Sequence, residues 1–79
     1  MKIQFVAKFS KDLRKIKDRK LLSEIKTIVN ECKLAQTLDN ITNLKKLKGY
    51  QGFYRIKIGD YRIGVAIIND ELIFSTLKN

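Results

Sequence analysis

Three cations flank a short turn in the second half of the sequence. Arg55 and Lys57 precede the pair Gly59-Asp60, and Arg62 follows it. If the two flanking segments pair as a hairpin, all three side chains project from one face, where opposed like charges destabilise the pairing. An arginine in such a place can bind a phosphate through two parallel hydrogen bonds. We therefore interpret Arg55, Lys57 and Arg62 as an anion-binding group.

A second basic run lies just upstream, in the segment LKKLKG. It contains Lys45, Lys46 and Lys48 and leads directly into the hairpin, so these lysines can lie near the cationic face. Neighbouring positive charges favour the neutral form of a lysine. A neutral lysine can act as a general base near neutral pH. The lysines are therefore candidates for proton transfer, and the arginines are candidates for binding charge.

The alternative reading is a solvated charged surface without a specific role. We adopt it for the lysines of the N-terminal half, which lie on expected helices: Lys8, Lys11, Lys15, Lys17 and Lys20. Arg55, Lys57 and Arg62 differ because they are close together and repel each other. A bound anion is the natural compensation for that repulsion.

Length and composition limit the classes of function. The 79 residues suffice for one domain, residues 1–79, and carry 17 Lys and Arg against 8 Asp and Glu, a net charge of +9. This excess favours an acidic partner: nucleic acid, an acidic protein or an anionic membrane. The absence of histidine excludes a Ser-His-Asp triad and a Cys/His metal site. The one cysteine, Cys32, fits a reducing cytosol and a place in a helical core.

No stretch of the sequence resembles a leader or a membrane span. The first residues, MKIQFVAKFSKDL, lack an apolar run long enough for a signal peptide. No segment approaches the ~20 apolar residues of a membrane span.

Hydrophobic spacing predicts the elements that carry these groups. The segment KIQFV alternates and predicts a first strand. Two segments follow in which apolar residues recur at helical spacing, and they predict two helices with Ser10 and Asp18 as N-caps. Three strands end the chain: FYRIKI and YRIGVAII around Gly59-Asp60, and ELIFSTL after Asn69-Asp70. We predict an α+β fold in which a helical hairpin packs on one face of a four-stranded sheet, three strands of which form an antiparallel meander. Residues 41–47 are expected to form a loop with a turn or two of helix.

A two-residue turn at Gly59-Asp60 sets the register of the hairpin. The core face should hold the pairs Ile58–Tyr61, Ile56–Ile63 and Tyr54–Val65, and the other face the pairs Lys57–Arg62, Arg55–Gly64 and Phe53–Ala66. A glycine opposite an arginine leaves room for a ligand or another backbone. Ile73 is expected beside Ala66, so the second face is basic at one end and apolar at the other. Such an apolar end should be covered, and little of the chain remains to cover it.

The segment NLKKLKGYQGFYRIKIGDYRIGVAI, residues 43–67, resembles the RelE/ParE superfamily of bacterial and archaeal toxins. The opening MKIQF and the segment FSKDLRKIKD fit as well, so the resemblance covers essentially the whole chain. It implies a compact α+β fold and a small antitoxin encoded beside the toxin. For the RelE branch it implies an mRNA endoribonuclease that acts on the ribosome without a metal or other cofactor. In that reaction a ribose 2′-OH attacks the adjacent phosphate.

The same resemblance assigns roles to individual residues. It implies catalytic roles for Lys45, Lys46, Lys48, Arg55 and Arg62. From the hairpin itself we expect Lys57 to contact the phosphate together with the two arginines. Arg62 is the expected phosphate clamp. Typical members of the family continue the last strand into a segment that supplies a further basic residue and a tyrosine, whereas this sequence reads ELIFSTLKN and stops. We therefore expect weakened or lost cleavage, with the fold and antitoxin binding retained.

Other functions remain open. As a ParE-like relative, the chain would inhibit DNA gyrase or serve only as an antitoxin-binding module, and the C-terminal departure favours this alternative. A general basic nucleic-acid-binding protein would bind through charge alone, with affinity that falls steeply as salt rises. A membrane-surface role is less favoured, because the apolar stripes of the helices are needed for the core.

Overall fold

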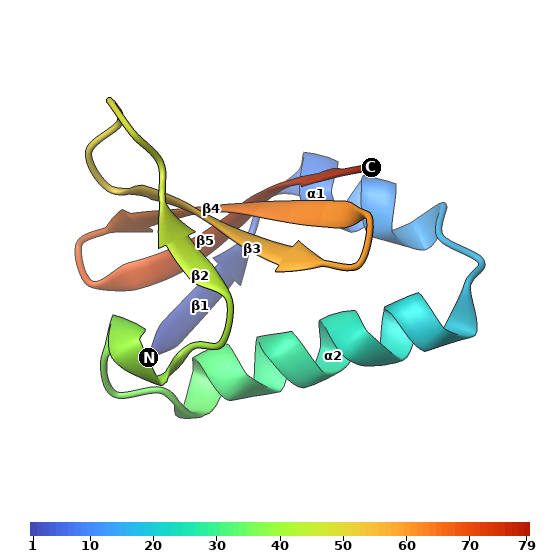
Figure 1. Ribbon diagram of the computed structural model, residues 1–79, viewed down its shortest axis with the longest axis horizontal. Helices are drawn as coiled ribbons and strands as arrows, with labels where there is room; N and C mark the ends of the chain where they lie inside the picture. The colour runs from blue at the N-terminus through green and yellow to red at the C-terminus, as the bar shows by residue number, and fades with distance from the viewer.

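The computed structural model describes residues 1–79, and its elements follow the predicted order of strand, helical hairpin and meander. Along the chain these are β1 (Lys2–Phe5), α1 (Ala7–Arg14), α2 (Arg19–Leu34), the short 3-10 helix η1 (Leu38–Asn40), β2 (Leu44–Lys46), β3 (Phe53–Ile58), β4 (Tyr61–Ile68) and β5 (Glu71–Lys78), as Figure 1 shows. The α+β class is therefore confirmed.

The sheet has five strands, in the order β1-β5-β4-β3-β2, and not the four that we expected. Only the β1–β5 pair is parallel. The additional strand is β2, which pairs Leu44 with Ile56 and Lys45 with Arg55, in a segment where we expected a turn or two of helix. The only helical turn in this region, η1, lies upstream. Three residues are too few to show a hydrophobic period, so pairing with β3 decides their conformation.

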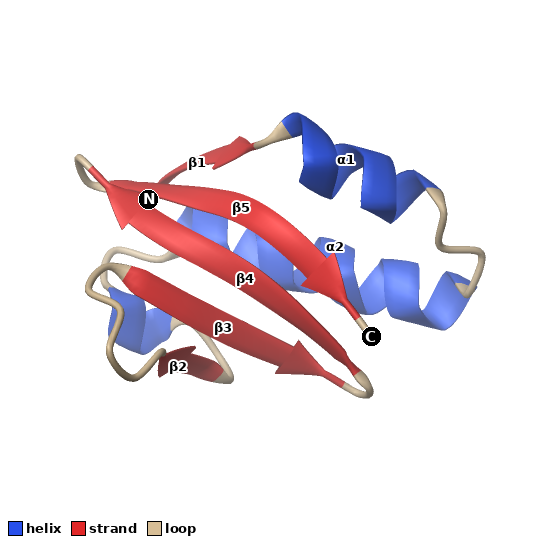
Figure 2. Cartoon of the chain, turned by 90° about the horizontal axis from the view of Figure 1, so that it is seen from above, coloured by secondary structure: helices blue, strands red, loops and turns tan.

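The two helices differ in how they meet the sheet. α2 crosses one face of the sheet, and α1 lies beside β5 near the edge formed by β1 (Figure 2). Asp18 caps α2 as predicted, because its carboxylate accepts hydrogen bonds from the amides of Lys20 and Leu21 at 3.0 and 3.2 Å. The predicted cap Ser10 is wrong. β1 runs almost directly into α1, so the Ser10 amide already donates to the Val6 carbonyl inside the first turn.

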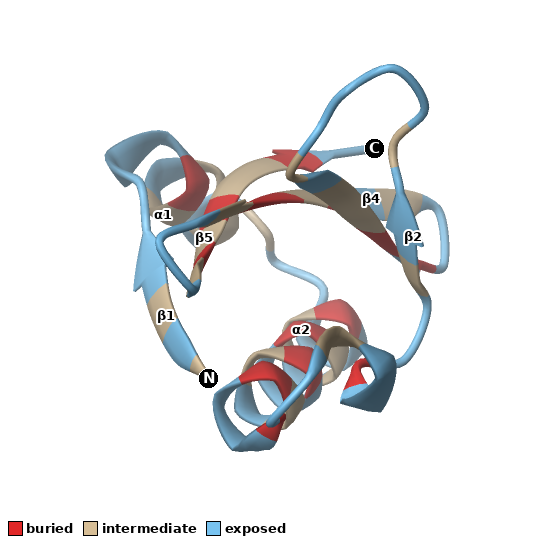
Figure 3. Cartoon of the chain, turned by 90° about the vertical axis from the view of Figure 1, so that its left-hand side faces the viewer, coloured by how far each residue is buried: buried red, intermediate tan, exposed pale blue.

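The core fills the space between the helices and the inner face of the sheet (Figure 3). Its largest fully buried side chains include Phe9, Phe74, Ile25 and Ile63. Cys32 belongs to this core, as predicted, and the loss of water around its thiol raises the pKa of Cys32 to about 11, with a smaller contribution from the charge of Glu31. Neither helix is long and apolar enough to cross a membrane.

The opposite face of the sheet carries no helix (Figures 2 and 3). The connection between β2 and β3, residues 47–52, rises beyond this face (Figure 1). We call this helix-free side the open face. It presents the alternate residues of β3, β4 and β5 that do not point into the core.

Candidate phosphate-binding site on the open face

The turn between β3 and β4 determines which side chains reach the open face. Gly59 has a φ of 56°, in the left-handed region that a tight two-residue turn requires. All six pairs that we predicted between the two strands are observed, including Lys57–Arg62, Arg55–Gly64 and Phe53–Ala66. The cations of this hairpin therefore lie on the face away from α2.

The neighbouring strands extend this group of cations on both sides. Lys45 of β2 lies beside Arg55, and Lys78 of β5 lies beside Arg62. We call Lys45, Arg55, Lys57, Arg62 and Lys78 the basic cluster. None of the five forms an ion pair, since the two salt bridges of the chain lie on β1–β5 and on α1. The cluster is thus a concentration of positive charge that the fold itself leaves uncompensated.

Part of the basic cluster surrounds a shallow hollow. The hollow has a volume of about 300 Å³ and is lined by Asn43, Lys45, Arg55, Lys57 and Gly59. Arg55 is partly buried there, whereas the two lysines are exposed. Three cations and an amide without a carboxylate make a site for an anion. An arginine held in this way can bind a phosphate and stabilise additional negative charge on it.

We predicted room at Gly64 for a ligand or for another backbone, and the neighbouring strand β5 occupies it. A side chain at this position would collide with Oγ1 of Thr76, which lies opposite Gly64 on β5. A bulge beside Gly64 also brings in Ser75, whose hydroxyl donates to the Gly64 carbonyl at 3.0 Å. The glycine therefore admits the neighbouring strand, and no room remains for a ligand to approach the backbone.

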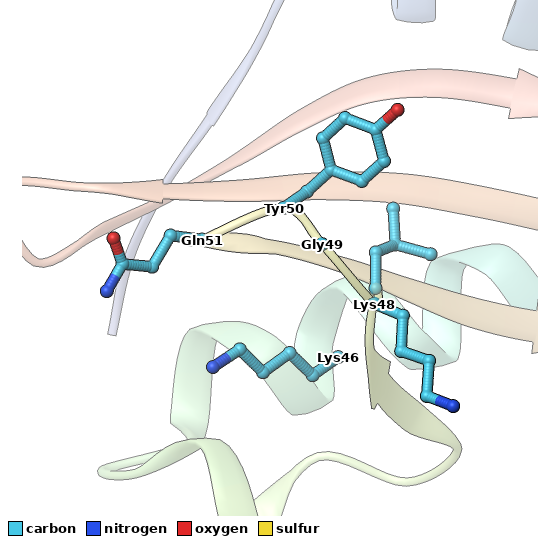
Figure 4. Close-up of a pocket in the computed structure, with 6 residues that line it drawn as sticks. Lys46, Lys48, Gly49, Tyr50 and Gln51 are labelled. Atoms are coloured by element: carbon cyan, nitrogen blue, oxygen red, sulfur yellow. The ribbon is translucent and has the colours of Figure 1, made fainter.

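The two other lysines of the upstream run do not join the basic cluster. Lys46 lies opposite Tyr54, on the side of β2 that faces away from Lys45, and Lys48 lies in the loop. The loop itself borders a hollow of about 510 Å³ lined by residues 46–51, from which Lys46 and Lys48 extend in different directions (Figure 4). Their side chains do not converge on a common point.

Two features of the open face were missed in the sequence. Lys78 lies two residues after Thr76 on β5 and so points to the same face. The alternation of side chains along a strand could have predicted this position from the sequence. The second is Tyr50, which packs its ring edge-on against Phe53. Ile73 lies beside Ala66 as expected. At this apolar end of the face, Tyr50 of the loop contacts Phe53.

Comparisons with known proteins agree with the fold. Residues 3–78 match the family described as the ParE toxin of the type II toxin–antitoxin system parDE. Toxin RelE3 of Methanocaldococcus jannaschii is 39% identical over 75 residues, which cover 94% of this chain and 84% of that protein. A chain of the RelB–RelE antitoxin–toxin complex from Methanococcus jannaschii superposes with a TM-score of 0.83 at 35% identity, covering 94% of this chain and 86% of its own. The YoeB dimer from Staphylococcus aureus shares the fold, with a TM-score of 0.79 at 18% identity and coverage of 100% and 95%.

Proposed function

The chain belongs to the ParE toxin family of type II toxin–antitoxin systems and is a toxin of RelE type, and from this membership we propose that it is an endoribonuclease that cleaves mRNA on the ribosome. One observation carries the proposal. The basic cluster lies unpaired on the open face, and Lys45, Arg55 and Lys57 converge in one hollow. An RNA phosphate supplies the negative charge that the cluster lacks within the chain. A ribosomal target assigns the activity to the cytoplasm.

In the proposed reaction the ribose 2′-OH attacks the adjacent phosphate. The hydroxyl loses its proton, a bond forms between O2′ and phosphorus, and the bond to the leaving 5′ oxygen breaks as that oxygen takes up a proton. Arg55 and Arg62 remain charged and stabilise the additional negative charge of the transition state. Lys45, on the same face as Arg55, exchanges a proton with the ribose, and Lys57 contacts the phosphate.

Lys46 and Lys48 have a different role in this proposal. Because neither lysine lines the hollow at Arg55, we assign them no contact with the reacting atoms. As exposed cations near the site, they attract RNA at long range and raise the rate of encounter.

Cleavage on translating ribosomes tests the proposal. Purified protein is added to a translation mixture, and the 5′ ends of the mRNA fragments are mapped. Cleavage that is weakened, as expected from the sequence, should still give cuts in the ribosomal A site at high concentrations of the wild type, and the rate should be about 10²–10³-fold lower for Arg55→Gln and Arg62→Gln, as for the loss of one donor to a developing oxyanion. The matched control is Arg14→Gln, which removes the same charge from the exposed side of α1 and should change the rate less than about twofold.

Two results would count against the proposal. The absence of A-site cleavage at high protein concentration would exclude the enzymatic function. If Arg62→Gln weakened RNA binding no more than Arg14→Gln, net charge alone would explain the affinity and no site would be needed.

We further propose that the chain binds a small cognate antitoxin encoded beside it. The proposal is supported by the 35% identical relative, whose solved structure is an antitoxin–toxin complex. The net charge of +9 favours an acidic segment in that partner. Co-expression with the neighbouring gene should yield a complex that survives purification, and separation of the two proteins on the first column would contradict it.

The family match to ParE favours a second candidate, a non-catalytic inhibitor of DNA gyrase. A supercoiling assay separates the two candidates. Inhibition of supercoiling without any cleavage of mRNA would establish the second and exclude the first.

A further inference from the structure

Two aromatic side chains lie exposed next to the basic cluster. The ring centroids of Tyr50 and Phe53 are 6.4 Å apart and their planes are inclined by 83°. Tyr50 is 65% exposed and Phe53 is 45% exposed. Phe53 lies on the open face two residues before Arg55, so the two side chains are neighbours along β3 on the same face. We call Tyr50 and Phe53 the aromatic corner.

The surface beside the aromatic corner is apolar and made of short side chains. Ala66 lies opposite Phe53 and is buried, and the partly buried Ile73 follows on the next strand. Tyr50 comes from the loop that rises beyond the open face, and Figure 4 shows its side chain pointing away from Lys46 and Lys48. Two perpendicular rings leave a face of each ring free, so a third flat ring can stack on one and meet the edge of the other.

We propose that the aromatic corner binds one nucleobase of single-stranded RNA, next to the phosphate held by Arg55. Single-stranded RNA carries flat rings and phosphates on one backbone, and proteins bind it with stacking aromatics beside a positively charged groove. An acidic peptide could pair with the adjacent cations, but it does not carry a flat ring beside every negative charge, as single-stranded RNA does, so we favour RNA as the occupant. Because the phosphate at Arg55 is taken from the proposed function, this inference rests on that function.

The consequence is that affinity has two separable components. The basic cluster recognises phosphates, and every oligonucleotide supplies them. The aromatic corner recognises a base, and an abasic nucleotide does not supply it. Stacking tolerates all four bases, so the aromatic corner adds affinity and position without a strict sequence requirement.

Binding of short oligonucleotides separates the two components. The probe is a labelled hexanucleotide with 2′-O-methyl groups, which cannot be cleaved by 2′-OH attack, and its partner is the same strand with abasic nucleotides. Affinity is measured by fluorescence anisotropy for the full chain, for Phe53→Leu and Tyr50→Leu, and for Ile68→Ala as the matched control. Ile68 is an aliphatic residue that is 52% exposed and lies on β4, on the open face like Ala66.

We expect Phe53→Leu to lower the affinity for the base-containing strand at least about fivefold, the lower limit for loss of one stacked base. Its affinity for the abasic strand should stay within twofold of the wild type, as should that of Ile68→Ala for both strands. Leucine keeps Ala66 covered, and circular dichroism verifies folding. If Phe53→Leu does not fold, Tyr50→Leu in the exposed loop provides the same measurement.

Three results would overturn the inference. The first two leave the proposed function standing, and the third removes both. If both aromatic variants bind the two strands like the wild type while Arg55→Gln weakens both, the phosphate site stands and the base site does not. If the aromatic variants lose the antitoxin but keep RNA, the corner is a protein-binding surface. If Arg55→Gln changes neither affinity, the phosphate site is absent, and the proposed function fails together with the inference.

Discussion

Neutralising Arg62 should make the free protein more stable. Arg62 lies on β4 between Lys57 of β3 and Lys78 of β5, on the same face, and no carboxylate pairs with any of the three. Arg62→Gln removes both like-charge contacts and keeps most of the side-chain stem. Because the substituted residue is exposed, its replacement does not disturb the core.

The size of the effect follows from the two contacts. A cross-strand charge pair is worth about 0.2–1 kcal/mol. Because these side chains are exposed and flexible, we expect the two contacts together to contribute about 0.5–1 kcal/mol at low ionic strength. For a domain of this size that is an increase in melting temperature of roughly 2–8 °C. At 0.15 M salt the Debye length is about 8 Å, so the gain should fall substantially.

Thermal unfolding at 10 mM and 500 mM salt, followed by circular dichroism, measures the effect. The matched control is Arg14→Gln in the last turn of α1, where a cation favours the helix dipole, so the same substitution should lower the stability slightly. Two results would contradict repulsion within the basic cluster: a melting temperature of Arg62→Gln below that of the wild type, or an increase in melting temperature that did not change with salt.

Three further predictions concern the packing, the thiol and the lysine run. Gly64→Ala should lower the free energy of unfolding by about 1–3 kcal/mol, because the added methyl collides with Oγ1 of Thr76. Adding Thr76→Ala removes the collision, so urea denaturation of the double variant should recover most of the loss, and strictly additive effects would contradict the contact. Burial raises the pKa of Cys32 to about 11 from 9.0, so between these values the folded chain holds a proton that the unfolded chain has released. The free energy of unfolding should therefore fall as the pH rises through 9 towards 11, by at most about 2–3 kcal/mol, and Cys32→Ala should not show this fall. If the free energies of unfolding of the wild type and the variant changed with pH in parallel, the prediction would be wrong. Lys45→Gln should weaken binding of the 2′-O-methyl hexanucleotide more than Lys46→Gln, and equal losses would show that the two faces of β2 do not differ in RNA binding.

The hairpin could be predicted in detail from its sequence because two local signals agree there. Gly59-Asp60 specifies a two-residue turn, and the alternation on either side has one register that buries the isoleucines and exposes the cations. The cap of α2 was predictable for the same reason, since the interaction of Asp18 with the following amides is local.

The remaining features depend on partners that are distant in the sequence. β2 is a strand because β3 pairs with it, and its three residues carry no period of their own. The use of Gly64 depends on Thr76, which a bulge brings opposite it. Likewise, the separation of Lys45 from Lys46 required the knowledge that this segment is extended, because only then do successive side chains point to opposite faces.

The basic cluster destabilises the free chain and attracts an anion for the same physical reason, which is its unpaired positive charge. Each like-charge contact on the open face destabilises the free chain, and a phosphate that binds there relieves several of these contacts at once. A ligand that binds only the folded state stabilises it by RT ln(1 + [L]/Kd), and this holds for the wild type and for Arg62→Gln, each with its own Kd. At saturating RNA the wild type therefore gains an excess of RT ln of the ratio of the two Kd values. A ratio above about five exceeds the ~1 kcal/mol of repulsion estimated for Arg62, so the stability order of the two proteins should reverse if Arg62→Gln weakens RNA binding by more than that factor. The core lies on the other side of the sheet, so the repulsion is confined to the face where binding can compensate for it.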